Sequence, residues 1–173
     1  MAGSPERAIE ITDGWVATAR RRYGPDSWKT VNTVEAAAKR RDDVGDHVGA
    51  LGLRREVVVK RREHLGPDDR QTLSAEYALA GTLLGLDRPA EARPLVEHVL
   101  ERCMADPGPD DPATLASLRD LALTLARMDR LLEAKVVAEN LVEGTARVHG
   151  PDHGSATDVR RLLARIEASL QSE

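Results

Sequence analysis

The octapeptide Gly108-Pro109-Asp110-Asp111-Pro112-Ala113-Thr114-Leu115 begins with a tripeptide that sets the period of this chain. Gly-Pro-Asp occurs four times, and its copies begin at Gly24, Gly66, Gly108 and Gly150. Each copy therefore begins 42 residues after the previous one, with no insertion or deletion between them. A fixed period of this length indicates an array of stacked structural repeats.

Aligning the repeats on this tripeptide shows that apolar residues recur at helical spacing. One column is alanine throughout, and the columns three and seven residues after it are apolar: Ala8, Ala50, Ala92 and Ala134; Ile11, Leu53, Leu95 and Val137; Trp15, Val57, Val99 and Leu141. Spacings of three, four and seven place these side chains on one stripe of an α-helix. A second set, which includes Leu79-Ala80 and Leu121-Ala122, predicts another helix in each repeat. The alanine column predicts a close approach of the two helices.

Short breaks separate the two helices of a repeat, for example Met128-Asp129-Arg130, so the helices should run antiparallel as a hairpin. The aspartate of each Gly-Pro-Asp can cap the helix that follows, and Asp111 before Pro112 fits an N-cap followed by a first-turn proline. Pro94 should bend its helix. The sequence predicts eight helices, over residues 4–22, 27–44, 47–64, 70–85, 89–105, 112–127, 131–147 and 154–171.

These residues resemble the tetratricopeptide repeat family in its 42-residue, kinesin-light-chain-like class. The resemblance rests on Gly108 to Leu115, on Leu121-Ala122 and on Glu133-Ala134, and it covers essentially the whole chain. It implies an all-α fold, a right-handed α-solenoid of antiparallel helix pairs. It also implies a single domain over residues 1–173, which divides into 1–23 (second helix of an incomplete repeat), the repeats 24–65, 66–107 and 108–149, and the capping helix 150–173.

The resemblance further implies a concave groove, lined by the first helix of each repeat, that binds peptide segments. The groove residues expected from this geometry are Asn32, Glu35, Lys39, Tyr77, Leu84, Arg119, Leu123, Arg127, Arg161 and Arg165, with Asp42 beside Lys39. Where the family has asparagines before the Leu-Ala pair that hold a peptide backbone, this chain has Glu35-Ala36, Tyr77-Ala78 and Arg119-Asp120. The four arginines suggest an acidic partner segment, because guanidinium pairs with carboxylate through two hydrogen bonds. The alternative is that these arginines are simply solvated.

Composition and motifs argue against several other classes of protein. The formal charge of −4 disfavours a nucleic-acid binder. No apolar run is long enough to span a membrane, and the first ten residues lack the apolar core of a signal peptide, so we expect a cytoplasmic protein. Cys103 is the only cysteine, and His149 and His153 are separated by Gly150-Pro151. We therefore expect no catalytic residues, no metal and no cofactor.

The ends of the chain differ in character. Arg160 and Glu167 replace Leu118 and Leu125 of the previous repeat, so the last helix should present a polar end. The first helix has an apolar outer face, which includes Trp15, so it should meet a second copy, a partner or a missing part of a longer chain. Together these features predict a non-enzymatic protein- or peptide-binding scaffold. The alternative is a sensor or regulatory segment of a larger STAND-type signalling ATPase or transcription regulator. An enzyme that uses the groove has no support from individual residues.

Overall fold

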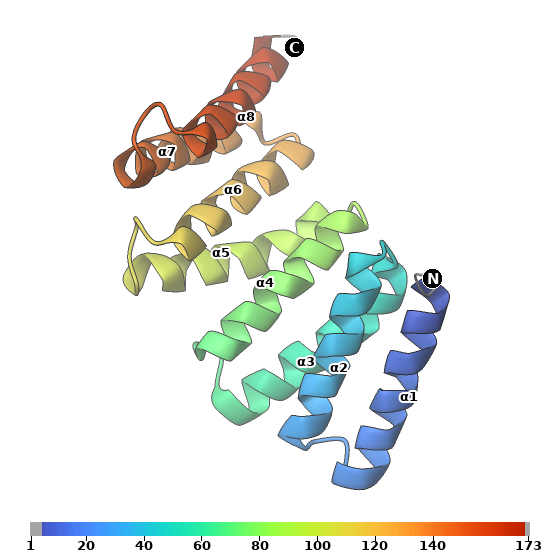
Figure 1. Ribbon diagram of the computed structural model, residues 1–173. Coiled ribbons are helices and arrows are strands. Elements are labelled where there is room, and N and C mark those ends of the chain that lie inside the picture. The colour runs from blue at the N-terminus through green and yellow to red at the C-terminus, as the bar shows by residue number, and fades with distance from the viewer. Residues whose placement is uncertain (1–4, 172–173) are drawn as a thin grey trace. The chain divides into compact units, whose positions relative to one another are not determined.

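The computed structural model describes residues 5–171, which form eight α-helices and no β-strand (Figure 1). The helices fall into two compact units that divide between Arg88 and Pro89. In each unit, consecutive helices pack against one another. Unit 1 contains α1 (Pro5–Tyr23), α2 (Trp28–Asp43), α3 (His47–Leu65) and α4 (Arg70–Gly85). Unit 2 contains α5 (Pro89–Ala105), α6 (Pro112–Arg127), α7 (Leu131–His149) and α8 (Gly154–Gln171).

The all-α prediction is confirmed helix by helix. Four predicted ranges match at both ends, and the other four differ by at most two residues at either end. The predicted start at residue 4 lies outside the described residues. α5 continues through Pro94 to Ala105, and the bend expected at Pro94 stays a prediction. The single domain over residues 1–173, with its five subdivisions, likewise stays a prediction.

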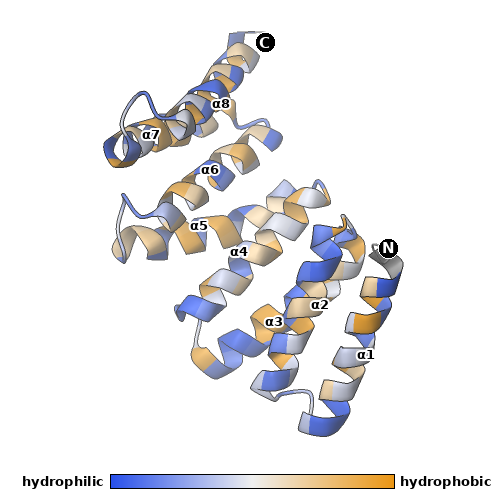
Figure 2. Ribbon diagram, viewed as in Figure 1, coloured by the Kyte–Doolittle hydropathy of each residue, from blue (hydrophilic) through white to orange (hydrophobic). Residues whose placement is uncertain are grey.

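Apolar residues lie between the helices, as the columns predict. Ala50, Ala92 and Ala134 are completely buried, which confirms that the alanine column marks a close approach of backbones. In unit 2, Leu115 of α6, Leu141 of α7 and Val159 of α8 form one buried cluster. Figure 2 shows hydrophobic and hydrophilic stretches on each helix, as expected when only one face is covered.

The Gly-Pro-Asp turns depend on glycine. Gly66 and Gly150 follow α3 and α7 with φ values of 91° and 88°, a region that side chains with a Cβ rarely adopt. A threonine six residues after the glycine closes the turn, because the Thr114 hydroxyl donates to the Gly108 carbonyl over 2.7 Å. The same contact joins Thr30 to Gly24.

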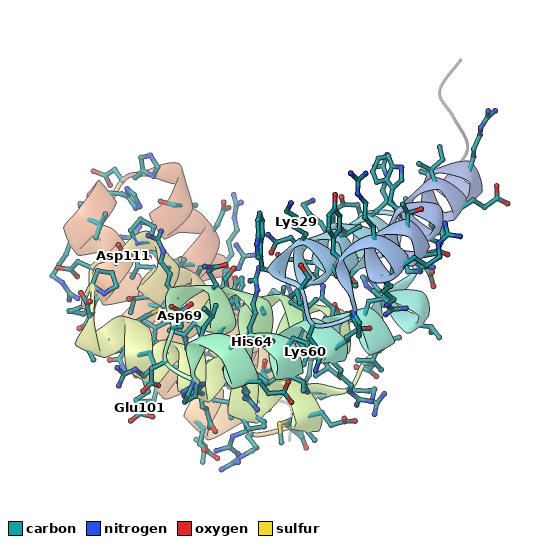
Figure 3. All side chains as sticks on the ribbon, turned by 90° about the horizontal axis from the view of Figure 1, so that it is seen from below. Lys29, Lys60, His64, Asp69, Glu101 and Asp111 are labelled. Carbon is teal, nitrogen blue, oxygen red and sulfur yellow. The ribbon has the colours of Figure 1, made fainter. Side chains whose placement is uncertain are left out.

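The N-cap residues of α4 and α6 lie one residue after the aspartate of the Gly-Pro-Asp tripeptide. Asp69 and Asp111 (both labelled in Figure 3) accept hydrogen bonds from the backbone N–H groups two residues on, which confirms Asp111 as an N-cap. The aspartate of the tripeptide itself still lies in the turn, so the prediction that it caps the helix was wrong. It binds the helix that ends the same repeat instead: Asp110 pairs with Arg147 of α7 over 2.9 Å.

The two terminal helices differ as predicted. On α8, Arg160 is exposed and donates to the Pro151 carbonyl, and Glu167 pairs with Lys135 over 3.0 Å. The polar outer face expected there is therefore present. On α1, Ile11 and Trp15 are 47% and 60% exposed, so the apolar face expected there is also present.

The cap of α8 offers a simple stability test. His153 occupies the column of Asp69 and Asp111, and its Nδ1 accepts the Ser155 N–H over a long 3.2 Å. Aspartate is a stronger N-cap and its charge favours the positive end of the helix dipole. We expect His153→Asp to raise the stability of α8 by about 0.5–1 kcal/mol, measured by hydrogen exchange of α8 amides. His153→Ala is the control, and protection as low as that of His153→Ala would contradict the prediction.

Candidate functional site

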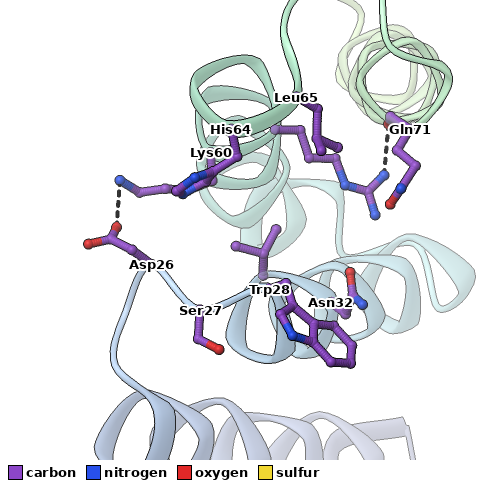
Figure 4. Close-up of a pocket in the computed structure, with 10 residues that line it drawn as sticks. Asp26, Ser27, Trp28, Asn32, Lys60, His64, Leu65 and Gln71 are labelled. Carbon is purple, nitrogen blue, oxygen red and sulfur yellow. Dashed lines mark hydrogen bonds and ion pairs between the residues drawn. The ribbon is translucent and has the colours of Figure 1, made fainter.

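The start of α2 borders a hollow in unit 1 with a volume of about 550 Å³ (Figure 4). The hollow lies where α2 faces the end of α3 and the start of α4, because the Gly-Pro-Asp turns bring these three helix ends together. It is lined by Asp26, Ser27, Trp28, Val31, Asn32, Lys60, Arg61, His64, Leu65 and Gln71.

A second hollow of about 530 Å³ adjoins the first along α2. It is lined by Asn32, Glu35, Ala36, Lys39 and Asp43 of α2, by Arg54 of α3, and by Ser74 and Ala78 of α4. Asn32 lines both hollows, so together they form one surface that follows α2 from its first turn to its last. We call this surface, formed by the lining residues of both hollows, the α2 strip.

One ion pair stands at the start of the α2 strip. Lys60 Nζ lies 2.7 Å from Asp26 Oδ1 and 3.0 Å from Glu63 Oε2 (Figure 4 shows the first contact). The hydrogen bond from Lys60 lowers the pKa of the Asp26 carboxyl, and the bonds to Asp26 and Glu63 raise the pKa of the Lys60 ammonium. Both groups therefore stay charged at neutral pH and neutralise each other.

Other charges of the α2 strip are paired in the same way. Arg61 donates through Nη2 to Glu35 over 2.6 Å and through Nη1 to the Gln71 carbonyl over 2.8 Å. Lys39 pairs with Asp43 over 2.9 Å, four residues on along α2. A ligand on this surface thus meets charges that already have partners, so it gains little from a charge of its own.

Neutral groups of the α2 strip remain exposed. The indole of Trp28 is 70% exposed, and Asn32, Gln71 and Ser74 are exposed as well. Trp28 and Asn32 are four residues apart, so they lie on one face of α2. The arrangement offers one large aromatic surface beside amide and hydroxyl groups that both donate and accept hydrogen bonds.

The structure brings together three of the predicted groove residues. Asn32, Glu35 and Lys39 all line the second hollow. Sequence reasoning missed Trp28 and Gln71, which lie on the same surface. The signal that the sequence offered for Trp28 was the rarity of aromatic residues, since the chain has only two tryptophans, two tyrosines and no phenylalanine.

Asp42 was wrongly grouped with Lys39 as a groove residue. Its carboxylate accepts hydrogen bonds from Arg54 Nε over 2.9 Å, from Thr82 Oγ1 over 2.9 Å and from the His47 ring over 3.0 Å. These partners come from α3 and α4, and the Asp42 side chain is only 17% exposed. Asp42 therefore ties three helices of unit 1 together.

The remaining predicted residues lie on α4 and in unit 2. Tyr77 and Leu84 are half-buried on α4 and do not line either hollow. On α6 and α8 of unit 2, Leu123 is half-buried and four arginines are exposed: Arg119, Arg127, Arg161 and Arg165. Arg161 forms an exposed ion pair with Asp158 over 3.1 Å. These arginines lie on the first helices α6 and α8 of unit 2, and their place in a groove stays a prediction.

Comparisons with known proteins agree with this architecture. The tetratricopeptide repeat family model matches residues 71–139. Two solved structures of a Podosopora anserina protein, described as a kinesin light chain with nearly identical TPR-like repeats, are 21% identical to this chain. They give TM-scores of 0.87 and 0.86 and cover 98% of this chain and 80% of theirs. This chain has the tetratricopeptide repeat (TPR) fold.

A further structure extends the likeness of this TPR array. BtubC (BKLC) from P. vanneervenii is 20% identical, with a TM-score of 0.73 over 96% of this chain and 67% of that one. A search of curated protein sequences found no match. At these identities the likeness to solved structures shows the fold alone, and the fold is consistent with a protein-interaction scaffold.

The histidines and the cysteine of the TPR array do not come together as a metal or catalytic site among residues 5–171. The His149 and His153 rings stack with centroids 5.1 Å apart, but no group of three metal-ligating side chains lies among residues 5–171. Burial raises the pKa of the Cys103 thiol, and nearby Asp111 raises it further, so the reactive thiolate is disfavoured. No helix in the described part of the chain is long and apolar enough to cross a bilayer.

Proposed function

We propose that this TPR array is a non-enzymatic binding module and that unit 1 holds a peptide segment along the α2 strip. The observation that supports this most directly is the continuous surface of two hollows, in which the ions are paired and Trp28 and Asn32 are exposed. A neutral ligand displaces water from Trp28 and Asn32 without breaking these ion pairs. Three of the groove residues expected from the sequence lie on it.

The chemistry of the α2 strip favours an uncharged stretch of peptide. A peptide backbone exposes N–H and C=O groups that need partners, and the side chains of Asn32, Gln71 and Ser74 can supply both kinds. Trp28 offers a large apolar surface for one side chain of the ligand. These neutral side chains would hold the peptide backbone in place of the family's asparagines, which this chain lacks.

Unit 2, taken by itself, offers a basic surface for a separate, acidic peptide segment. Arg119, Arg127, Arg161 and Arg165 are exposed on α6 and α8. Arginine forks bind carboxylates through two parallel hydrogen bonds, and the exposed pair of Arg161 with Asp158 is weak enough to exchange for a ligand. Asp or Glu near one end of such a segment would pair with these side chains.

The proposal can be tested with peptides selected from a random phage-displayed library on the whole chain. We expect Trp28→Ala and Asn32→Ala each to weaken the selected peptides about tenfold, which corresponds to about 1.4 kcal/mol, in calorimetric titrations. Val48→Ala is the matched control, because Val48 is 78% exposed on α3 and does not line the α2 strip.

Two further readings decide the outcome. Acidic peptides that bind unit 2 should lose affinity in an Arg119→Ala, Arg127→Ala variant, while neutral peptides that bind the α2 strip should not. Affinities that stay equal in the Trp28, Asn32 and Val48 variants would place binding outside the α2 strip and refute the proposal.

A further inference from the structure

α1 has an apolar stripe that the corresponding helices of the other repeats keep covered. The stripe consists of Ala8, Ile11 and Trp15, and we call it the open stripe. Trp15 is 60% exposed, whereas the residues in the same column of the other repeats are nearly inaccessible: Val57 at 1%, Val99 at 4% and Leu141 at 2%. The other side of α1 packs on α2 through Thr12, Val16 and Ala19, which are buried.

Within each unit, the first helix of a hairpin covers the second: α2 packs against α3, and α6 packs against α7. In unit 2, Leu115 and Leu118 of α6 lie in the cluster around Leu141. α1 is the first helix that the structure describes, so no helix among residues 5–171 occupies this position beside it. By the symmetry of the repeats, the open stripe should therefore fit a helix that resembles the first helix of a TPR hairpin.

The side chains of such a covering helix can be read from this chain. α2 and α6 each have an alanine at the centre, and Ala38 and Ala122 are completely buried. In unit 2, Leu141 meets Leu115 and Leu118 of α6, so the helix that covers Trp15 needs apolar side chains at those two positions. Two copies of α1 would instead set Trp15 against Trp15, which is bulkier than the leucines that meet in the hairpin.

α8 of a second copy is a poor occupant as well. α8 corresponds to the first helix of a repeat, but its residues in the columns of Leu118 and Leu125 of α6 are Arg160 and Glu167. Arg160 and Glu167 already bind Pro151 and Lys135 within unit 2. An apolar stripe that meets these charges would desolvate them without compensation.

A positive charge near the end of α1 indicates which residue should precede the covering helix. Arg21 near the end of α1 occupies the column of Arg147 near the end of α7, and Arg147 pairs with Asp110 two residues before α6. Arg21 is exposed, and its Nη2 lies 3.5 Å from the Thr18 hydroxyl. An acidic residue just before the covering helix would therefore meet Arg21 as Asp110 meets Arg147.

We propose that the open stripe binds an amphipathic helix of another protein, antiparallel to α1, with apolar residues opposite Trp15 and an acidic residue just before its first turn. This surface lies on α1, apart from the residues of the α2 strip. Binding there completes a helical hairpin and covers Ile11 and Trp15.

The probe is a synthetic peptide of residues 108–127 of this chain, which contains Asp110 and the covering face of α6. The matched control is a peptide of residues 150–171, which contains the polar face of α8. In a Trp28→Phe background, Trp15 is the only tryptophan, so its fluorescence reports the open stripe. We expect the first peptide to bind and shift the Trp15 emission to shorter wavelength, and the second peptide to bind at least tenfold more weakly.

Variants locate the contact. Trp15→Arg, at an exposed position, should fold normally by circular dichroism and lose at least tenfold in affinity for the first peptide, as measured by calorimetry. Arg21→Glu should weaken the peptide, and an Asp110→Arg peptide should regain affinity on it. Equal binding of both peptides, or binding unchanged by Trp15→Arg, would overturn the proposal. A dimer, seen by light scattering, that dissociates in the Trp15→Arg variant would also overturn the proposal, because the occupant would then be a second copy. Trp28→Ala leaves this binding intact, which separates it from the α2 strip.

Discussion

Replacing Asp42 with alanine is expected to lower the free energy of unfolding of unit 1 by about 3–5 kcal/mol. Asp42 neutralises Arg54, whose side chain is 8% exposed, and it also accepts hydrogen bonds from Thr82 and His47. Alanine at this position leaves the Arg54 guanidinium buried without its carboxylate. The loss of one partner of a buried pair costs far more than an exposed pair contributes, since the remaining charge cannot reach water.

Asp43 provides the matched control. It is the next residue, it is exposed, and it pairs with exposed Lys39. Asp43→Ala should therefore change stability by about 0.5 kcal/mol at most. Urea titrations followed by circular dichroism give the two free energies, and hydrogen exchange should show the Asp42→Ala effect in α2, α3 and α4. Equal effects of the two substitutions would show that the Asp42 contacts contribute nothing special to stability.

The contrast between these neighbours shows where sequence reasoning stops. The helices could be predicted because their signals are local: glycine and proline mark the turns, and apolar residues repeat at helical spacing. Asp42 and Asp43 give the same local signal. What separates them is the rotation of the last turn of α2 against α3 and α4, and Thr82 lies 40 residues further along the chain.

Glu76 shows the same limit within a repeat column. It shares its column with Val34 and Leu118, and like Val34 it is completely buried, although it is a carboxylate. Arg62 of α3 lies 2.7 Å from it. The repeat pattern predicts that this position faces another helix, but not that an arginine from the neighbouring helix meets it there.

The candidate site divides along the same line. Asn32, Glu35 and Lys39 could be placed on one surface because they lie on one face of one helix. Trp28 and Gln71 could not, because the first hollow forms only where the ends of three helices meet. The capping aspartates were placed one residue early for a related reason: the turn geometry, and not residue type alone, decides which carboxylate reaches the first free N–H groups.

Leu141→Ala is expected to destabilise unit 2 by about 3 kcal/mol. Leu141 is 2% exposed, and it packs in the cluster with Leu115 and Val159, so three helices lose contacts around the cavity that alanine leaves. Leu132→Ala is the control on the same helix: Leu132 is 72% exposed, and its truncation should change stability by about 0.5 kcal/mol at most.

Hydrogen exchange distinguishes a local effect from a global one. In a repeat array, stability is the sum of terms within each repeat and terms between neighbouring repeats, so a cavity at Leu141 should lower protection first in α6, α7 and α8. The midpoint of urea unfolding gives the total loss. A Leu141→Ala protein as stable as Leu132→Ala would mean that α7 relaxes into the cavity. The apolar column that defines the repeats would then not be what holds the helices of unit 2 together.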